Sequence, residues 1–202
     1  FIWGPLKFDI KKNVKNSKHH FQNITQSYIS LISLVTITYI CSLLILESYD
    51  FFKTYPGVEF ISAILIIVAF LRSNYYMYAS GAEFGKNMYM LPLSDIGYLL
   101  IIFILFKFSP FIQYNIFHLM IPIIIAELYS IVLMRNYSNS KFYYKINFIT
   151  GFTTFSFALI CVLFCLKQHL TLFIPLFFVS VVSILINRNS IKLTKNLLGN
   201  KL

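Results

Sequence analysis

Acidic residues are scarce in this chain, and their scarcity argues against several kinds of membrane enzyme and carrier. Only seven of the 202 residues are Asp or Glu, and no two of them pair at helical spacing within an apolar segment. A membrane hydrolase or an ion-driven carrier is expected to hold two carboxylates, or a carboxylate and a histidine, together inside the bilayer. The acids are Asp9, Glu47, Asp50, Glu59, Glu83, Asp95 and Glu127.

The sequence also lacks the motifs of nucleotide-binding and hydrolytic proteins. It contains no GxxxxGK[ST] loop, no HExxH and no GxSxG. Cys161 and Cys165 share a helix face but have no histidine or carboxylate beside them, and Cys41 lies alone in an apolar run. These cysteines are interpreted as packing residues. We therefore predict a chain that is not an enzyme and that has no cofactor or metal of its own.

Apolar residues dominate what is present. They make up 58% of the sequence, charged residues make up 12%, and the mean hydropathy is +0.73. A soluble domain of this length could not bury so much apolar surface, so the solvent must be lipid. Charges fall between long apolar runs, which predicts an all-α integral membrane protein. Heavy use of Ile, Phe, Tyr, Asn and Lys is typical of an AT-rich bacterial genome, so we expect a bacterial cell membrane.

Six apolar runs are long enough to cross roughly 30 Å of hydrocarbon, which takes about 20 helical residues. The third run is the shortest and carries Lys107 near its outer end. Together the runs define a six-span domain over residues 28–187. The predicted spans are Tyr28–Leu46, Val58–Tyr78, Ile96–Ile112, Ile116–Met134, Ile146–Leu166 and Leu170–Ile186.

The distribution of Lys and Arg predicts the orientation of these spans. With the N-terminus inside, Lys53, Lys107 and Lys167 fall on the outer side and every other Lys and Arg falls on the inner side. We therefore expect a multi-pass protein with both termini in the cytoplasm and a basic cytoplasmic tail over residues 188–202. The net charge of +10 is assigned to orientation and to contact with anionic lipid, because no basic cluster accompanies a soluble fold. Nucleic acid is not an expected partner.

The N-terminal segment predicts a basic amphipathic helix in the inner interface. Trp3, Leu6, Ile10 and Val14 recur at spacings of three and four, with lysines between them. This elbow helix ends near His19-His20 and belongs to a cytoplasmic segment over residues 1–27. A disordered basic tail is the alternative. The chain opens on Phe1 without an initiator Met and shows no cleavable signal, so we expect residues to be missing before it.

Polar residues inside the spans are candidates for lining a transport pathway. Glu127 is the only acid deep in a span, so it is either functional or a protonated or hydrogen-bonded contact between helices. Arg72 lies toward the inner end of the second span and is followed by Asn74 and Tyr75. These residues predict either an interfacial aromatic belt or the polar inner mouth of a pathway.

The inner loop over residues 80–95 is the most distinctive segment. Phe84, Met88 and Leu91 recur at four and three, which predicts a short amphipathic helix parallel to the membrane. Gly81 and Gly85 would give it flexible joints. Pro92 would end it and Ser94 would cap the third span. Such a helix can seat in a groove of a soluble protein, although a simple interfacial connector is the alternative.

With this loop in place, the chain resembles the small permease subunits of ABC-2 type exporters. Those proteins have six spans, an N-terminal elbow helix and a cytoplasmic coupling helix between spans two and three. Their loop carries an acid and then a Leu-Pro-aliphatic-Ser/Thr stretch, which correspond here to Glu83 and to Leu91-Pro92-Leu93-Ser94 before Ile96. Asp95 departs from the basic residue that often follows the Ser. The size and composition are most similar to permeases for phenol-soluble modulins and bacteriocins.

The resemblance implies a permease subunit of an exporter for amphipathic or antimicrobial peptides or other hydrophobic substrates. ATP and Mg²⁺ would bind a separate cytoplasmic ABC ATPase, and a second permease subunit, identical or related, would complete the pathway. The alternative is a stand-alone membrane interaction or immunity protein with no ATPase partner. A lipid-modifying enzyme and a channel are further alternatives with less support in the sequence. The ATPase-binding residues implied are Glu83, Phe84, Lys86, Asn87, Met88 and Leu91.

Overall fold

In a computed structural model, the chain forms an all-helical bundle over residues 17–84, 88–108, 116–141, 146–167 and 169–199. These described ranges contain six helices long and apolar enough to cross a membrane, which confirms the predicted number of spans. The chain is thus a multi-pass membrane protein in composition and architecture. The helices are α2 (Ser17–Ser48), α3 (Val58–Phe84), α4 (Met90–Phe108), α5 (Met120–Lys141), α6 (Phe148–Lys167) and α7 (Ile174–Gly199), with short 3-10 turns η2 (Ile116–Leu119) and η3 (Leu170–Phe173).

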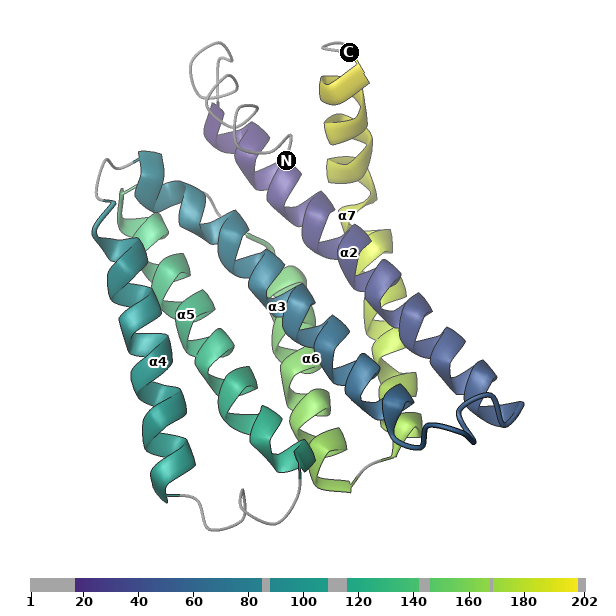
Figure 1. Cartoon of the computed structure of the whole chain (residues 1–202). Coiled ribbons are helices and arrows are strands. Elements are labelled where there is room, and N and C mark those ends of the chain that lie inside the picture. The colour runs from purple at the N-terminus through teal and green to yellow at the C-terminus, as the bar shows by residue number, and fades with distance from the viewer. Residues whose placement is uncertain (1–16, 85–87, 109–115, 142–145, 168, 200–202) are drawn as a thin grey trace.

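The helices run alternately up and down. The start of α2, the end of α7 and the ends that join α3 to α4 and α5 to α6 all lie at one end of the bundle (Figure 1). α2 pairs with α7, while α3 and α4 both pack on α5, and α6 joins the two groups. Arg135, Arg188, Lys192 and Lys195 belong to that shared end, so the arrangement fits the charge distribution, while the side of the membrane remains a prediction.

The first and last helices extend beyond the predicted spans. α2 begins at Ser17 rather than at Tyr28, so His19 and His20 start a spanning helix instead of closing an interfacial one. α7 continues through Arg188 to Gly199, so the expected basic tail is largely helical. The predicted elbow helix lies mostly in residues 1–16, outside the described part of the chain. Polar contacts join the two extensions: Ser190 and Thr194 of α7 contact Asn23, Gln26 and Ser27 of α2.

The core is built from branched aliphatic and aromatic side chains that meet between α2, α3, α6 and η3. Ile37, Ile64 and Phe157 are fully buried in it. The Phe70 and Phe157 rings lie 4.6 Å apart between centroids, and those of Phe164 and Phe173 lie 4.7 Å apart. Lipid tails are as apolar as these residues, so the gain comes from close packing rather than from the hydrophobic effect.

Gly81 serves packing rather than chain flexibility. It lies inside α3, where an added Cβ would meet the side chain and the backbone of Ser138 on α5. Ser138 donates a hydrogen bond to the carbonyl of Tyr78 on the facing helix. The prediction of a flexible joint at Gly81 is therefore wrong, because the missing side chain is what lets α3 and α5 approach. Gly85 lies outside the described residues.

The segment predicted as a separate short helix is divided between two long ones. Residues 80–84 complete α3, and Met90 begins α4, six residues before the predicted start at Ile96. Pro92 does not end a helix. It lies in the first turn of α4, where backbone N–H groups have no partner within the helix, so a proline loses no hydrogen bond there. Ser94 is a buried residue within α4 rather than its cap.

Candidate functional site

A charged cluster joins α3, α4 and α5. The Arg72 guanidinium on α3 donates to the carboxylate of Asp95 on α4, with Nη2 3.3 Å from Oδ1. Its Nη1 lies 3.8 Å from Oε2 of Glu127 on α5. One cation therefore holds two carboxylates from two other helices, and the cluster carries a formal excess of one negative charge when all three groups are ionised.

Three tyrosine rings surround the guanidinium of Arg72. Its Cζ lies 4.6 Å from the ring centroid of Tyr75, 5.4 Å from that of Tyr76 and 5.7 Å from that of Tyr98. Each distance is within the range of a cation–π contact, which strengthens when the cation is removed from water. The three rings help to fix the position of the guanidinium, and Tyr75, singled out from the sequence beside Arg72, is one of them.

Glu127 is the buried member of the cluster. Its side chain is 4% exposed, against 31% for Arg72 and 50% for Asp95. The Glu127 Oε2 atom makes no hydrogen bond within the described residues, so its contact with Arg72 is electrostatic. Glu127 thus contacts a neighbouring helix, but through an ion pair rather than the expected protonated or hydrogen-bonded contact.

Local packing sets the position of Asp95. α4 passes close to α5 at Gly97, where an added Cβ would lie 2.7 Å from Cε1 and 3.0 Å from the hydroxyl of Tyr129. The absent side chain lets the Tyr129 ring lie against α4 two residues after Asp95. Because Tyr129 and Glu127 belong to the same helix, this contact holds α4 at the level where Asp95 reaches Arg72.

The pathway residues predicted from the sequence are only partly brought together. Arg72, Tyr75 and Glu127 belong to the charged cluster, but Asn74 points to α6, where its Nδ2 donates to Thr154 Oγ1 at 3.2 Å. Asp95 was not among the candidates. The signal available for it was physical: a lone arginine inside a span needs a nearby acid, and Asp95 is the acid closest to the membrane interior on the next span.

The predicted ATPase-binding residues also separate. Phe84 is buried, with its ring 4.8 Å from that of Phe21 on α2, so it cannot form one exposed stripe with Met88 and Leu91. Glu83 and Leu91 are half-buried, and Lys86 and Asn87 lie outside the described residues. Met88 is 56% exposed and Tyr89 beside it is also exposed. The neighbouring phenol of Tyr137 on α5 raises the pKa of Tyr89.

A polar seam between α2 and α7 is the largest feature that the sequence interpretation missed. Asn187 is its centre: Nδ2 donates to Ser30 Oγ at 2.9 Å and to Thr150 Oγ1 at 3.1 Å, while Oδ1 accepts from Asn147 at 3.2 Å. Ser30 also contacts Ser183, with their hydroxyl oxygens 2.9 Å apart. The available signal was the alternating spacing of three and four along Ser180, Ser183, Asn187, Ser190 and Thr194.

The seam continues toward the end of the bundle where α2 begins. Ser190 Oγ lies 3.1 Å from Oδ1 of Asn23 and 3.0 Å from Oε1 of Gln26. The Ser190 hydroxyl directs its one proton toward these two amide oxygens. The seam is a bonded contact between helices.

Comparison with known proteins found no family model, no curated protein and no solved structure that matches the chain. Among the described residues, no group of three or more His, Cys, Asp or Glu side chains is placed to hold a metal ion.

Proposed function

We propose that the chain is the membrane subunit of an ATP-driven ABC exporter, with its α3–α4 corner facing a cytoplasmic ATPase. The observation that carries this proposal is the exposure of Met88 and Tyr89 at that corner, immediately before Leu91-Pro92-Leu93-Ser94. Exposed apolar residues at the basic end of a membrane bundle suit contact with a soluble partner. The partner would touch the turn itself, since the flanking residues belong to α3 and α4.

The charged cluster suits an amphipathic or otherwise hydrophobic cargo. A peptide of this kind needs apolar contacts for one face and fixed charges for the other. Tyr75, Tyr76 and Tyr98 offer the first, and the partly exposed Arg72 and Asp95 offer the second. ATP binding and hydrolysis on the partner would then move the α3–α4 corner and alter the contact between Arg72 and Asp95, which lie on its two helices.

One observation favours the alternative of a stand-alone membrane protein. A separate coupling helix is absent from the described residues between α3 and α4, so any ATPase contact has to form on a short turn. A membrane protein that only sequesters a peptide would need no such contact. The two functions differ in whether a nucleotide-binding protein accompanies the chain in the membrane.

The test is to purify the tagged chain from its native membrane in mild detergent and to identify every protein that accompanies it. The exporter function predicts a stoichiometric ATPase that is lost in Met88→Asp. Tyr55→Asp is the control, because Tyr55 is also an exposed apolar residue, at 71% against 56% for Met88, but belongs to the α2–α3 connection at the opposite end of the bundle. Recovery of the chain alone, or loss of the ATPase in both variants, contradicts contact at this corner.

A further inference from the structure

Three exposed cations near the end of α7 have no acidic neighbour on the helices around them. Arg188, Lys192 and Lys195 are all exposed, and none of them makes an ion pair within the described residues. α7 and α6 contain no Asp or Glu, and the single acid of α2, Glu47, lies in the last turn of that helix, at the other end of the bundle (Figure 1). The positive charge at this corner is therefore available to a negatively charged ligand.

The three cations lie on the side of α7 that is turned away from α2. They follow one another at spacings of four and three, so they share one side of the helix, which we call the basic face. The polar seam occupies a different side, because Asn187, Ser190 and Thr194 contact α2. With that side bonded to α2, the basic face is directed outward from the bundle.

The same outward side of α7 is apolar farther into the membrane. Phe178, Leu185 and Lys192 recur at intervals of seven residues, which brings them to one side of the helix. Phe178 is 65% exposed and Leu185 is 61% exposed. In a bilayer, large apolar side chains on the outside of a bundle contact lipid tails, which are as apolar as they are. The basic face therefore continues a side of the helix that meets lipid.

The length of the last span places the basic face at the level of the lipid headgroups. The apolar crossing starts at Leu170, because the charged Lys167 lies just before it. η3 has four residues at about 2.0 Å each and α7 continues at about 1.5 Å each, so Arg188 lies about 29 Å beyond Leu170. Lys192 lies about 35 Å and Lys195 about 40 Å beyond it on the same scale. Since the hydrocarbon core is about 30 Å thick and the headgroup layer adds about 5–7 Å, the basic face extends through that layer.

We propose that the basic face binds the phosphate groups of anionic phospholipids. Guanidinium and ammonium groups donate charge-assisted hydrogen bonds to phosphate oxygens, and anionic headgroups attract basic residues at the end of a membrane helix. The order of the surfaces along α7 selects lipid as the ligand. A phospholipid presents apolar tails and then a phosphate, in the same order as Phe178, Leu185 and the basic face, whereas an acidic protein would match the charge alone.

Tryptophan fluorescence of the full chain in vesicles tests this site. Trp3→Phe removes the only tryptophan of the chain, and Leu185→Trp then reports on the lipids beside the basic face. The vesicles contain equal amounts of phosphatidylglycerol and phosphatidylcholine, with brominated tails on one lipid or the other, because bromine quenches tryptophan on contact. Brominated phosphatidylglycerol should quench more strongly than brominated phosphatidylcholine. One cation near an anionic surface contributes about fivefold to binding, so Lys192→Gln should lower this preference by up to about fivefold.

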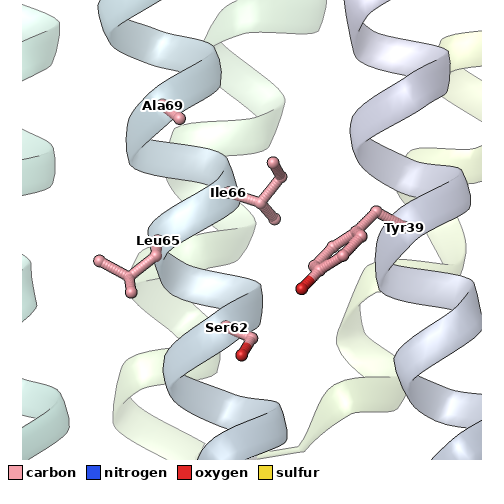
Figure 2. Close-up of a pocket in the computed structure, with 5 residues that line it drawn as sticks. All are labelled: Tyr39, Ser62, Leu65, Ile66 and Ala69. Carbon is pink, nitrogen blue, oxygen red and sulfur yellow. The ribbon is translucent and has the colours of Figure 1, made fainter.

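Two controls separate the basic face from the rest of the bundle. Lys53→Gln removes an exposed cation from the α2–α3 connection, at the other end of the bundle, and should leave the preference unchanged. Tyr39→Trp replaces Leu185→Trp in the second control and should be quenched equally by the two lipids. Tyr39 lies on a shallow groove between α2 and α3 whose lining carries no charged residue (Figure 2), the other lining residues being Ser62, Leu65, Ile66 and Ala69.

Three results would overturn the proposal. The first is equal quenching of Leu185→Trp by the two lipids, which would leave an acidic protein as the partner of the basic face. The second is the same preference at Tyr39→Trp, which would mean that anionic lipid gathers around the whole bundle. The third is a preference that survives the combined change of Arg188, Lys192 and Lys195 to glutamine. These side chains are exposed and make no ion pair within the described residues, so the triple variant is expected to fold.

Discussion

The guanidinium of Arg72 lies 3.8 Å from the carboxylate of Glu127, and both belong to apolar helices. Arg72 also holds Asp95 at 3.3 Å, so it is the shared partner of two acids. Removing one partner of a buried ion pair leaves an uncompensated charge, whereas removing both leaves none. Single substitutions in the cluster are therefore expected to reduce stability by different amounts, and a double substitution is expected to recover part of the loss.

Arg72→Gln should destabilise the chain far more than Glu127→Gln. Loss of the guanidinium leaves Glu127 buried without its counter-charge, a change that costs about 3–5 kcal/mol in soluble proteins. Glu127→Gln keeps the Arg72–Asp95 pair, and the double variant should recover much of the loss. Unfolding in detergent would measure all three variants. Equal losses in the two single variants, with no recovery in the double variant, would contradict the ion pair.

Two glycine substitutions should differ in size. Gly97→Ala meets the far end of the Tyr129 ring, which can move, whereas Gly81→Ala meets both the side chain and the Cα of Ser138. Overpacking costs about 1–3 kcal/mol, and we expect Gly81→Ala at the upper end of this range and Gly97→Ala at the lower end. Melting temperatures in detergent would rank the variants. Tyr129→Leu should rescue Gly97→Ala and leave Gly81→Ala unchanged.

Asn187→Leu should loosen the contacts of α7 with α2 and with the start of α6. The change removes the partner of Ser30, Thr150 and Asn147 together. Single hydrogen bonds between membrane helices contribute about 0.6 kcal/mol on average, so the loss of three predicts about 2 kcal/mol. Ser42→Ala is the control, because the Ser42 hydroxyl donates to the Tyr39 carbonyl on its own helix. Equal stability of the two variants would mean that the seam adds nothing.

Phe84→Ala should lower stability, and Met88→Ala should not. Phe84 packs on Phe21 and is buried, whereas Met88 is exposed on the turn. Loss of a buried phenylalanine costs about 3–5 kcal/mol in soluble proteins. Unfolding of the two variants in detergent would show whether Phe84 supports the core while Met88 does not. If both variants kept full stability, Phe84 would not be part of the core.

The sequence predicted some parts of the candidate site and missed others for a definite reason. Arg72 and Glu127 were predicted because a charged residue inside an apolar run can be recognised from that run alone, without knowing which helices are neighbours. Asp95 and the seam around Asn187 were missed because each depends on which helices are neighbours, and hydropathy does not carry that information. Phe84 was assigned to a surface for a similar reason: its spacing from Met88 is helical, but Phe84 ends α3 and Met88 lies in the turn before α4.

The amino-acid sequence by itself determined that this is a membrane protein with six spans, because the length of each apolar run is fixed by the thickness of hydrocarbon. The distribution of lysine and arginine was sufficient to predict which ends of the spans lie together. Only the tertiary structure decided that Arg72 joins Asp95 to Glu127, that Gly81 is a packing residue and that α2 and α7 meet through polar side chains. These are contacts between helices, and their geometry depends on how side chains from separate parts of the chain fit together.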